Sequence, residues 1–193
     1  MTYGNFFKRL IDITLSLTVF VAALPVLLLC ALLVKLTSQG DVLFLQERVG
    51  LNGRRFSIYK LRTMRTGNTS LGRQTRLGDS DVTFVGNILR RFKLDELPQV
   101  VNVLLGDMSL VGPRPCLVQT VDSMPEWAKA RFSVRPGMTG LAQINGNAAI
   151  SWESRWRYDT AYADSCSFLV DLSIMLKTFA VVVFGEERFG AAK

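Results

Sequence analysis

The sequence predicts an α/β fold that is mostly helical, with one small domain behind an N-terminal membrane helix. Three features predict it: an uncharged apolar run at residues 13–34, two segments around a turn at residues 50–53 of which the second partly alternates, and apolar residues at helical spacing in residues 84–93. The chain has 193 residues and shows no repeat, linker or second domain. We therefore expect residues 1–193 to form one domain with its own buried core.

The apolar run at residues 13–34 is long enough to cross the hydrocarbon core of a bilayer as a helix. A cleaved signal peptide fits poorly, because the run is long for such a segment and ends without small residues. Pro25 lies near its middle, where it removes a backbone donor and bends or breaks a helix. Basic residues flank both ends, and the positive-inside tendency then places both ends in the cytoplasm. A re-entrant helix broken at Pro25 satisfies this pattern, and a kinked single span is the alternative.

Asp12 lies at the edge of this run, where a carboxylate is costly unless it is paired or solvated. Lys8 precedes it by one helical turn, so the two side chains would be neighbours on a helix face. Pairing with Lys8 and solvation at the membrane surface are the two alternatives.

The segments on either side of residues 50–53 predict a β-hairpin. Residues 65–81 are polar and rich in glycine, which is typical of either a surface loop or a lid over a site. A helix is predicted at residues 84–93, and a second one runs to about Leu105 and ends at Gly106. The apolar stretch at residues 168–184 contains two charges, which favours an interfacial amphipathic helix or one packed on the core.

The composition restricts the chemistry, because the chain carries a formal net charge of +7 and has no histidine. A basic chain favours anionic partners such as nucleic acid, acidic lipids or phosphorylated substrates. No aromatic and basic stacking platform is evident, so no nucleic-acid partner is expected. Catalytic and metal-binding roles must fall to residues other than histidine. The three cysteines show neither metal-ligand spacing nor a disulfide pattern.

Asp95 and Glu96 are adjacent acids at the predicted start of the second helix. Acids in such positions are also common caps and dipole partners. Here, however, basic residues on otherwise stiff elements accompany them. Carboxylates hold Mg²⁺, arginine binds phosphate oxygens in pairs, and a carboxylate can attack phosphorus to form an acyl phosphate. The combination therefore indicates phosphoryl-transfer chemistry. The basic residues are Lys60, Arg62, Arg90, Arg91 and Arg114.

Several segments together resemble the bacterial sugar transferase family, the small monotopic phosphoglycosyl transferases of the PglC-like type. The resemblance covers about residues 5–183 and is most specific in the block DELPQVVNVLLGDMSLVGPRP. The other matching segments are FLQERVGLNGRRFSIYKLRTM, RPGMTGLAQING and SWESRWRYDTAY.

The resemblance implies an enzyme that moves a sugar-1-phosphate from a UDP-sugar to undecaprenyl phosphate and releases UMP. In such enzymes the reaction is ping-pong, and the residue matching Asp95 becomes covalently attached to the phosphosugar. Asp95 and Glu96 are then also the expected Mg²⁺ ligands. Arg114 is expected either to order this dyad or to bind phosphate. The residues expected to bind substrate are Lys60, Arg62, Arg90, Arg114 and Arg135.

The resemblance also implies that the N-terminal helix is re-entrant, with its break at Pro25. Residues 1–36 would then enter the lipid bilayer from the cytoplasmic leaflet of the bacterial inner membrane. Residues 37–193 would form the catalytic part on the cytoplasmic face. The family often has Ser-Pro at the break, where this chain has Leu24-Pro25.

Other features leave alternatives open. Many relatives have Asn-Gly-Arg-Asn where this chain has Asn145, Gly146, Asn147 and Ala148, so its sugar specificity is not evident. The glycan pathway is open as well, and a homodimer is compatible with the sequence. Two other functions compete with the covalent mechanism: a transferase in which the lipid phosphate attacks the UDP-sugar directly, and a membrane-anchored binding module without catalytic activity.

Overall fold

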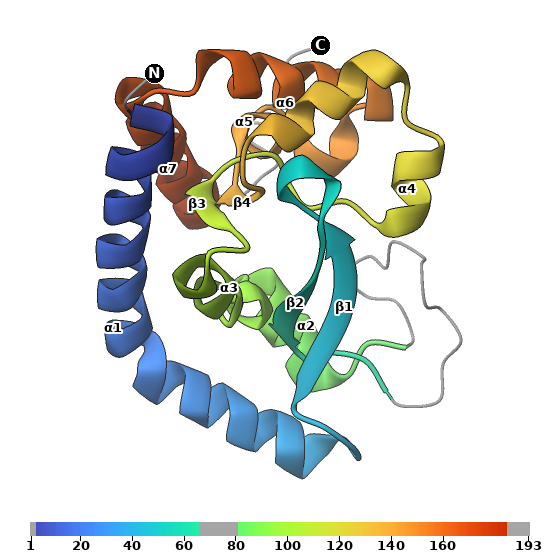
Figure 1. Ribbon diagram of the computed structural model, residues 1–193. Coiled ribbons are helices and arrows are strands. Elements are labelled where there is room, and N and C mark those ends of the chain that lie inside the picture. The colour runs from blue at the N-terminus through green and yellow to red at the C-terminus, as the bar shows by residue number, and fades with distance from the viewer. Residues whose placement is uncertain (1–2, 66–80, 185–193) are drawn as a thin grey trace.

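The computed structural model describes residues 3–65 and 81–184 (Figure 1). The surface loop or lid predicted at residues 65–81 lies, apart from its two end residues, outside these ranges. A π-helical turn, Tyr3–Phe7, leads into the long helix α1, Lys8–Thr37. The rest of the described chain packs on the inner side of α1 as short helices and two small sheets (Figure 1).

Helix α1 exposes most of its apolar side chains, and it is long and apolar enough to cross a membrane. The sequence predicts a break at Pro25, whereas α1 stays helical through this residue. Its ribbon changes direction near the middle of the helix (Figure 1). Proline removes one backbone hydrogen bond and crowds the preceding turn, so it bends a helix whose other hydrogen bonds persist. The predicted mostly helical α/β domain with a long apolar N-terminal helix is confirmed.

Polar side chains attach the first half of α1 to the domain. The Asp12 carboxylate accepts hydrogen bonds from Ser109 Oγ at 3.0 Å and from Leu110 N at 3.1 Å. Lys8 Nζ forms a buried ion pair of 2.5 Å with Asp171. The prediction that Lys8 pairs with Asp12 is therefore wrong, and so is the alternative that water solvates Asp12, because partners distant in sequence bury both groups.

The predicted hairpin is present as β1, Leu43–Val49, and β2, Arg55–Leu61, which pair in antiparallel register. The turn includes Arg54 as well as the four predicted residues, and a 3₁₀ turn at Leu51–Gly53 shapes it. Asn52 has a φ of 53°, a left-handed conformation that asparagine tolerates better than most residues. Ile58 of β2 is buried against Val103 and Met108, which attaches the hairpin to the domain.

Two helices flank the acidic pair. Helix α2, Phe84–Arg91, begins at Thr83, whose hydroxyl accepts a hydrogen bond of 2.9 Å from Gly86 N. It ends before the predicted residue 93, because Lys93 takes a left-handed conformation with a φ of 56°. Helix α3, Gln99–Leu105, ends as predicted at Gly106.

Two short strands that the sequence analysis did not predict form a small parallel sheet. It consists of β3, Ser109–Val111, and β4, Gly137–Thr139. The strands approach so closely that a Cβ on Gly137 would lie 2.0 Å from the backbone nitrogen of Gly112. Only glycine fits there, which explains the glycine in each segment.

Helices complete the domain behind this sheet. Helix α7, Phe168–Phe184, buries Ile174 and Asp171 against the core and exposes Leu169, Leu176 and Phe179. One face of this helix is therefore packed on the core, as one prediction had it, and the other is apolar and exposed, as expected of an interfacial helix. One of several buried hydrophobic clusters lies where β3, α5, α6 and α7 meet, around Tyr162. The remaining elements are α4 (Val118–Asp122), η4 (Glu126–Ser133), α5 (Leu141–Ile144), η5 (Asn147–Ala149) and α6 (Trp152–Ser165).

Candidate active site

The acidic pair lies in a 3₁₀ turn, Leu94–Glu96, between α2 and α3. Glu96 Oε1 accepts a hydrogen bond of 2.7 Å from Lys60 Nζ, which comes from β2. The same carboxylate accepts hydrogen bonds from both terminal nitrogens of Arg114, which lies in the loop after β3. Three elements distant in sequence thus meet at one carboxylate, which brings two predicted substrate-binding cations to the predicted dyad.

The two acids differ in electrostatic environment. Burial raises the pKa of Glu96, but the charges of Arg114 and Lys60 outweigh it and hold this pKa below its ordinary range. Burial and the Glu96 charge raise the pKa of Asp95 above its ordinary value, against the opposing effects of Lys60 and Arg90. Glu96 is therefore a firmly held anion, whereas Asp95, only 8% exposed, is a carboxylate of higher basicity.

Arg90 lies near the dyad as well. Its Nε donates a hydrogen bond of 2.9 Å to Thr63 Oγ1, which fixes the end of α2 against the chain that follows β2. Its charge acts on the Asp95 carboxylate. Together with Lys60 and Arg114, Arg90 makes the surroundings of the dyad strongly cationic.

The other two predicted substrate-binding arginines are engaged elsewhere. Arg62 donates to the hydroxyl and the carbonyl of Ser38, at 3.0 and 2.9 Å, and so ties β2 to the end of α1. Arg135 Nε donates at 3.0 Å to the carbonyl of Gly106, at the end of α3 away from the dyad. The hypothesis that these two residues bind substrate stays a prediction.

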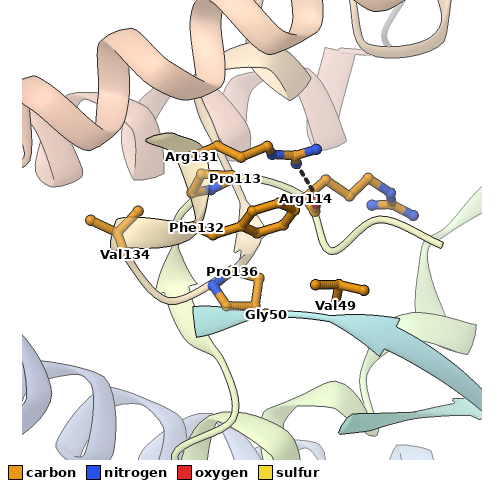
Figure 2. Close-up of a pocket in the computed structure, with 8 residues that line it drawn as sticks. All are labelled: Val49, Gly50, Pro113, Arg114, Arg131, Phe132, Val134 and Pro136. Carbon is orange, nitrogen blue, oxygen red and sulfur yellow. Dashed lines mark hydrogen bonds between the residues drawn. The ribbon is translucent and has the colours of Figure 1, made fainter. Parts of the chain in front are cut away.

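The loop that carries Arg114 is held by arginines that the motif analysis left out of the site. Arg131 donates a hydrogen bond of 2.5 Å to the carbonyl of Arg114 (Figure 2) and pairs at 2.9 Å with Asp159 of α6. Arg48 donates at 3.2 Å to the carbonyl of Pro115. Arg48 lies in a segment that carries the family resemblance, and this position could have identified it as a candidate site residue. Nothing in local periodicity identifies a buried pair such as Arg131 and Asp159.

A pocket opens beside this loop, between the hairpin turn and η4 (Figure 2). Arg114 lines it with its side chain directed along the loop, and Arg131 crosses above Phe132. The pocket therefore adjoins the residue that binds Glu96. Its lining residues are Val49, Gly50, Pro113, Arg114, Arg131, Phe132, Val134 and Pro136.

The sequence that builds this site matches a known family over the whole described chain. The family model for bacterial sugar transferases matches residues 3–185. The chain belongs to the bacterial sugar transferase family. This transferase is 41% identical over 180 residues to the sugar transferase EpsL of Bacillus subtilis, which covers 93% of this chain and 88% of EpsL.

Two further relatives carry names that state an activity. The UDP-glucose:undecaprenyl-phosphate glucose-1-phosphate transferase of Caulobacter vibrioides is 44% identical over 182 residues, covering 89% of this chain and 67% of the relative. The UDP-N-acetylgalactosamine-undecaprenyl-phosphate N-acetylgalactosaminephosphotransferase of Aeromonas hydrophila is 40% identical over 193 residues, covering 96% of this chain. The transferase spans only 45% of that longer relative.

The dyad of this transferase has a donor set compatible with Mg²⁺. Mg²⁺ is usually bound by one or two carboxylates, with substrate phosphates and water as the other ligands. Within residues 3–65 and 81–184, no group of three or more acidic or cysteine side chains could enclose a metal. Because Glu96 is bound by Lys60 and Arg114, Asp95 would be the main protein ligand, with Glu96 beside it.

Proposed function

We propose that this sugar transferase moves a sugar-1-phosphate from a UDP-sugar to undecaprenyl phosphate and releases UMP. The observation that carries the proposal is the convergence of Lys60 and Arg114 on Glu96, next to Asp95. This arrangement provides a carboxylate nucleophile beside cations that neutralise phosphate oxygens. The names of the relatives from Caulobacter and Aeromonas support the same substrate classes.

In the first step, an Asp95 oxygen attacks the β-phosphorus of the UDP-sugar. A bond forms between this oxygen and phosphorus, the bond to the bridging oxygen breaks, and UMP leaves with the electron pair. Arg114, Lys60 and Arg90 neutralise the phosphate charges. A Mg²⁺ bound by Asp95 and Glu96 would supply additional charge neutralisation on the diphosphate.

In the second step, a phosphate oxygen of undecaprenyl phosphate attacks the phosphorus bound to Asp95. The Asp95–phosphorus bond breaks, the free carboxylate is restored, and the product is an undecaprenyl diphosphate sugar. Glu96 is held by two cations throughout, so we assign it to positioning the cationic groups and the metal rather than to bond formation.

The membrane part of the proposal is that α1 is re-entrant. The bend of α1 (Figure 1) and the attachment of its polar face to the domain support insertion from one side of the bilayer. Exposed apolar side chains on α2, at the residue that ends it and on α7 would rest at the interface, among them Phe84, Phe92 and Phe179. The catalytic part, residues 37–193, would then lie on the cytoplasmic face of the bacterial inner membrane.

Release of UMP from a panel of UDP-sugars tests the proposal. With undecaprenyl phosphate and Mg²⁺, at least one UDP-sugar should yield UMP, and initial rates should follow a ping-pong pattern. Direct attack by the lipid phosphate would give a ternary-complex pattern and no labelled enzyme. A binding module without activity would release no UMP from any sugar in the panel.

A further inference from the structure

Guanidinium groups from three distant parts of the chain gather around the loop after β3. Arg114 belongs to this loop, Arg48 lies at the end of β1, and Arg155 lies in the first turns of α6. Arg48 reaches the loop through its hydrogen bond to the carbonyl of Pro115. Arg155 stacks on the ring of Trp152, with 4.6 Å between its guanidinium carbon and the ring centroid.

Arg48 and Arg155 both carry an unused donor. The Nε atoms of these two side chains are buried and have no hydrogen-bond partner in the described parts of the chain. A buried donor without a partner costs about 1–3 kcal/mol, so native proteins rarely keep one that has no ligand or water to bind. Two such donors, each on a cation that feels the charge of Arg114, indicate a missing acceptor.

The charge of Arg114 also repels the charges of Arg48 and Arg155. Burial and the Arg114 charge lower the pKa of Arg155, and the same causes lower the pKa of Arg48 to about 10. Both effects require the guanidinium groups to lie close to Arg114. Gathering like charges at a half-buried place is unfavourable unless an anion compensates them.

Within the described residues, the two nearby acids pair with cations other than Arg48 and Arg155. Asp159 Oδ2 pairs with Arg131 at 2.9 Å, while the buried Oδ1 of Asp159 has no hydrogen-bond partner in the described parts of the chain. Glu96 binds Lys60 at 2.7 Å and also binds Arg114. Within the described residues, neither Arg48 nor Arg155 forms an ion pair with an acid. The protein thus leaves positive charge at this place for a ligand.

We propose that Arg48 and Arg155, together with Arg114, bind the phosphate that stays on the nucleotide: the α-phosphate of the UDP-sugar, and afterwards the phosphate of UMP. The inference rests on the proposed function, and it assigns substrate binding to two residues that the sequence motifs do not. Because Arg114 also contacts Glu96, this phosphate would lie next to the dyad. The β-phosphorus, one bridging oxygen away, would then face Asp95.

The position in the fold favours the nucleotide over the lipid phosphate. The turn end of the hairpin and α6 lie together at one end of the molecule, and the second half of the apolar helix α1 lies at the other (Figure 1). A phosphate anchored by a lipid tail would approach from the side of α1. The three arginines are better placed for a substrate that arrives from water.

Binding of UMP to the purified full-length protein tests the inference without turnover. By titration calorimetry in detergent, Arg155→Gln and Arg48→Gln should each weaken UMP binding about tenfold, the effect of losing one charge-assisted contact. Binding of uridine, which has no phosphate, should not change. Arg155→Lys keeps the charge and should restore part of the UMP affinity. Arg157→Gln is the matched control, because Arg157 is exposed on the same helix and should leave UMP binding unchanged.

Three outcomes would overturn the inference. One is unchanged UMP affinity in both glutamine variants; the second is an equal loss of uridine and UMP binding, which would indicate a structural role. The third is weaker binding of a short prenyl phosphate without an effect on UMP, which would assign the arginines to the lipid substrate. If UMP binds through Arg155 but no UDP-sugar yields UMP, the proposed function fails while the phosphate site stands.

Discussion

Lys60 Nζ and Glu96 Oε1 lie 2.7 Å apart, although 36 positions separate the two residues in the sequence. The hairpin places Lys60 there, and the 3₁₀ turn between α2 and α3 presents Glu96 to it. Because Arg114 binds the same carboxylate, Glu96 is committed to two cations. Asp95, its neighbour, is therefore the member of the dyad assigned to covalent chemistry.

Replacing each acid in turn should separate the nucleophilic role of Asp95 from the positioning role of Glu96. Asp95→Asn should lower turnover on the order of 10⁴-fold or more and abolish the covalent phosphosugar, because an amide oxygen is a poor nucleophile. Glu96→Gln should retain some labelling, since the nucleophile is still present. Intact-mass spectrometry after incubation with UDP-sugar and Mg²⁺, without lipid acceptor, measures the adduct. Full activity in Asp95→Asn would exclude this residue as the nucleophile.

Loss of the Asp12 carboxylate should loosen the attachment of α1 to the domain. Asp12→Ala leaves two donors, Ser109 Oγ and Leu110 N, without their acceptor, and should reduce the free energy of unfolding by about 1–3 kcal/mol. Chemical denaturation in detergent measures this change. Thr14→Ala, an exposed position on the same helix, is the control and should stay within about 0.5 kcal/mol. Equal stability of the two variants would contradict the anchoring role of Asp12.

The buried carboxyl of Asp159 should make stability depend on pH. Burial raises its pKa to about 6, above the ordinary 3.8, although Arg131 opposes the shift. The folded protein then holds this proton more tightly than the unfolded chain, so the contribution of Asp159 to the free energy of unfolding is complete below about pH 4. It declines as the pH rises to about 6 and is constant above.

Asp159→Asn should remove this decline, because asparagine does not titrate. Denaturation of the wild type and the variant at several pH values between about 4 and 7 measures the difference. Glu153→Gln is the matched control on α6, since Glu153 is exposed and should leave the pH profile unchanged. Parallel profiles for the wild type and Asp159→Asn would show that Asp159 does not titrate in this range.

Thiol labelling at the two ends of α1 tests whether the helix is re-entrant or spans the bilayer. If the helix is re-entrant, single cysteines at Thr2 and Gln39, in a chain without its native cysteines, should both resist a membrane-impermeant thiol reagent in intact cells. Both should react once the inner membrane is permeabilised. A cysteine in the exposed loop of a known periplasmic protein serves as the positive control. Labelling of only one end in intact cells would mean that α1 spans the bilayer.

Much of the fold was predictable because its signals are local. The apolar run of α1, the turn between β1 and β2, and the glycine that ends α3 each depend on neighbouring residues. The Asp95–Glu96 pair was identified as a candidate from its residue types and the family motif around it. The lengths of elements were less predictable: Lys93 ends α2 early through a backbone conformation that its side chain does not signal.

The sequence by itself determined the apolar helix, the hairpin and the acidic pair, since period, turn chemistry and residue type act over a few positions. Only the tertiary structure decided that Lys8 pairs with Asp171, that Asp12 binds β3, and that Arg131 and Asp159 support the loop of Arg114. The physical reason is that a charged side chain takes the partner that packing brings within reach. Local spacing predicts which groups need a partner when buried, but not which distant residue will supply it.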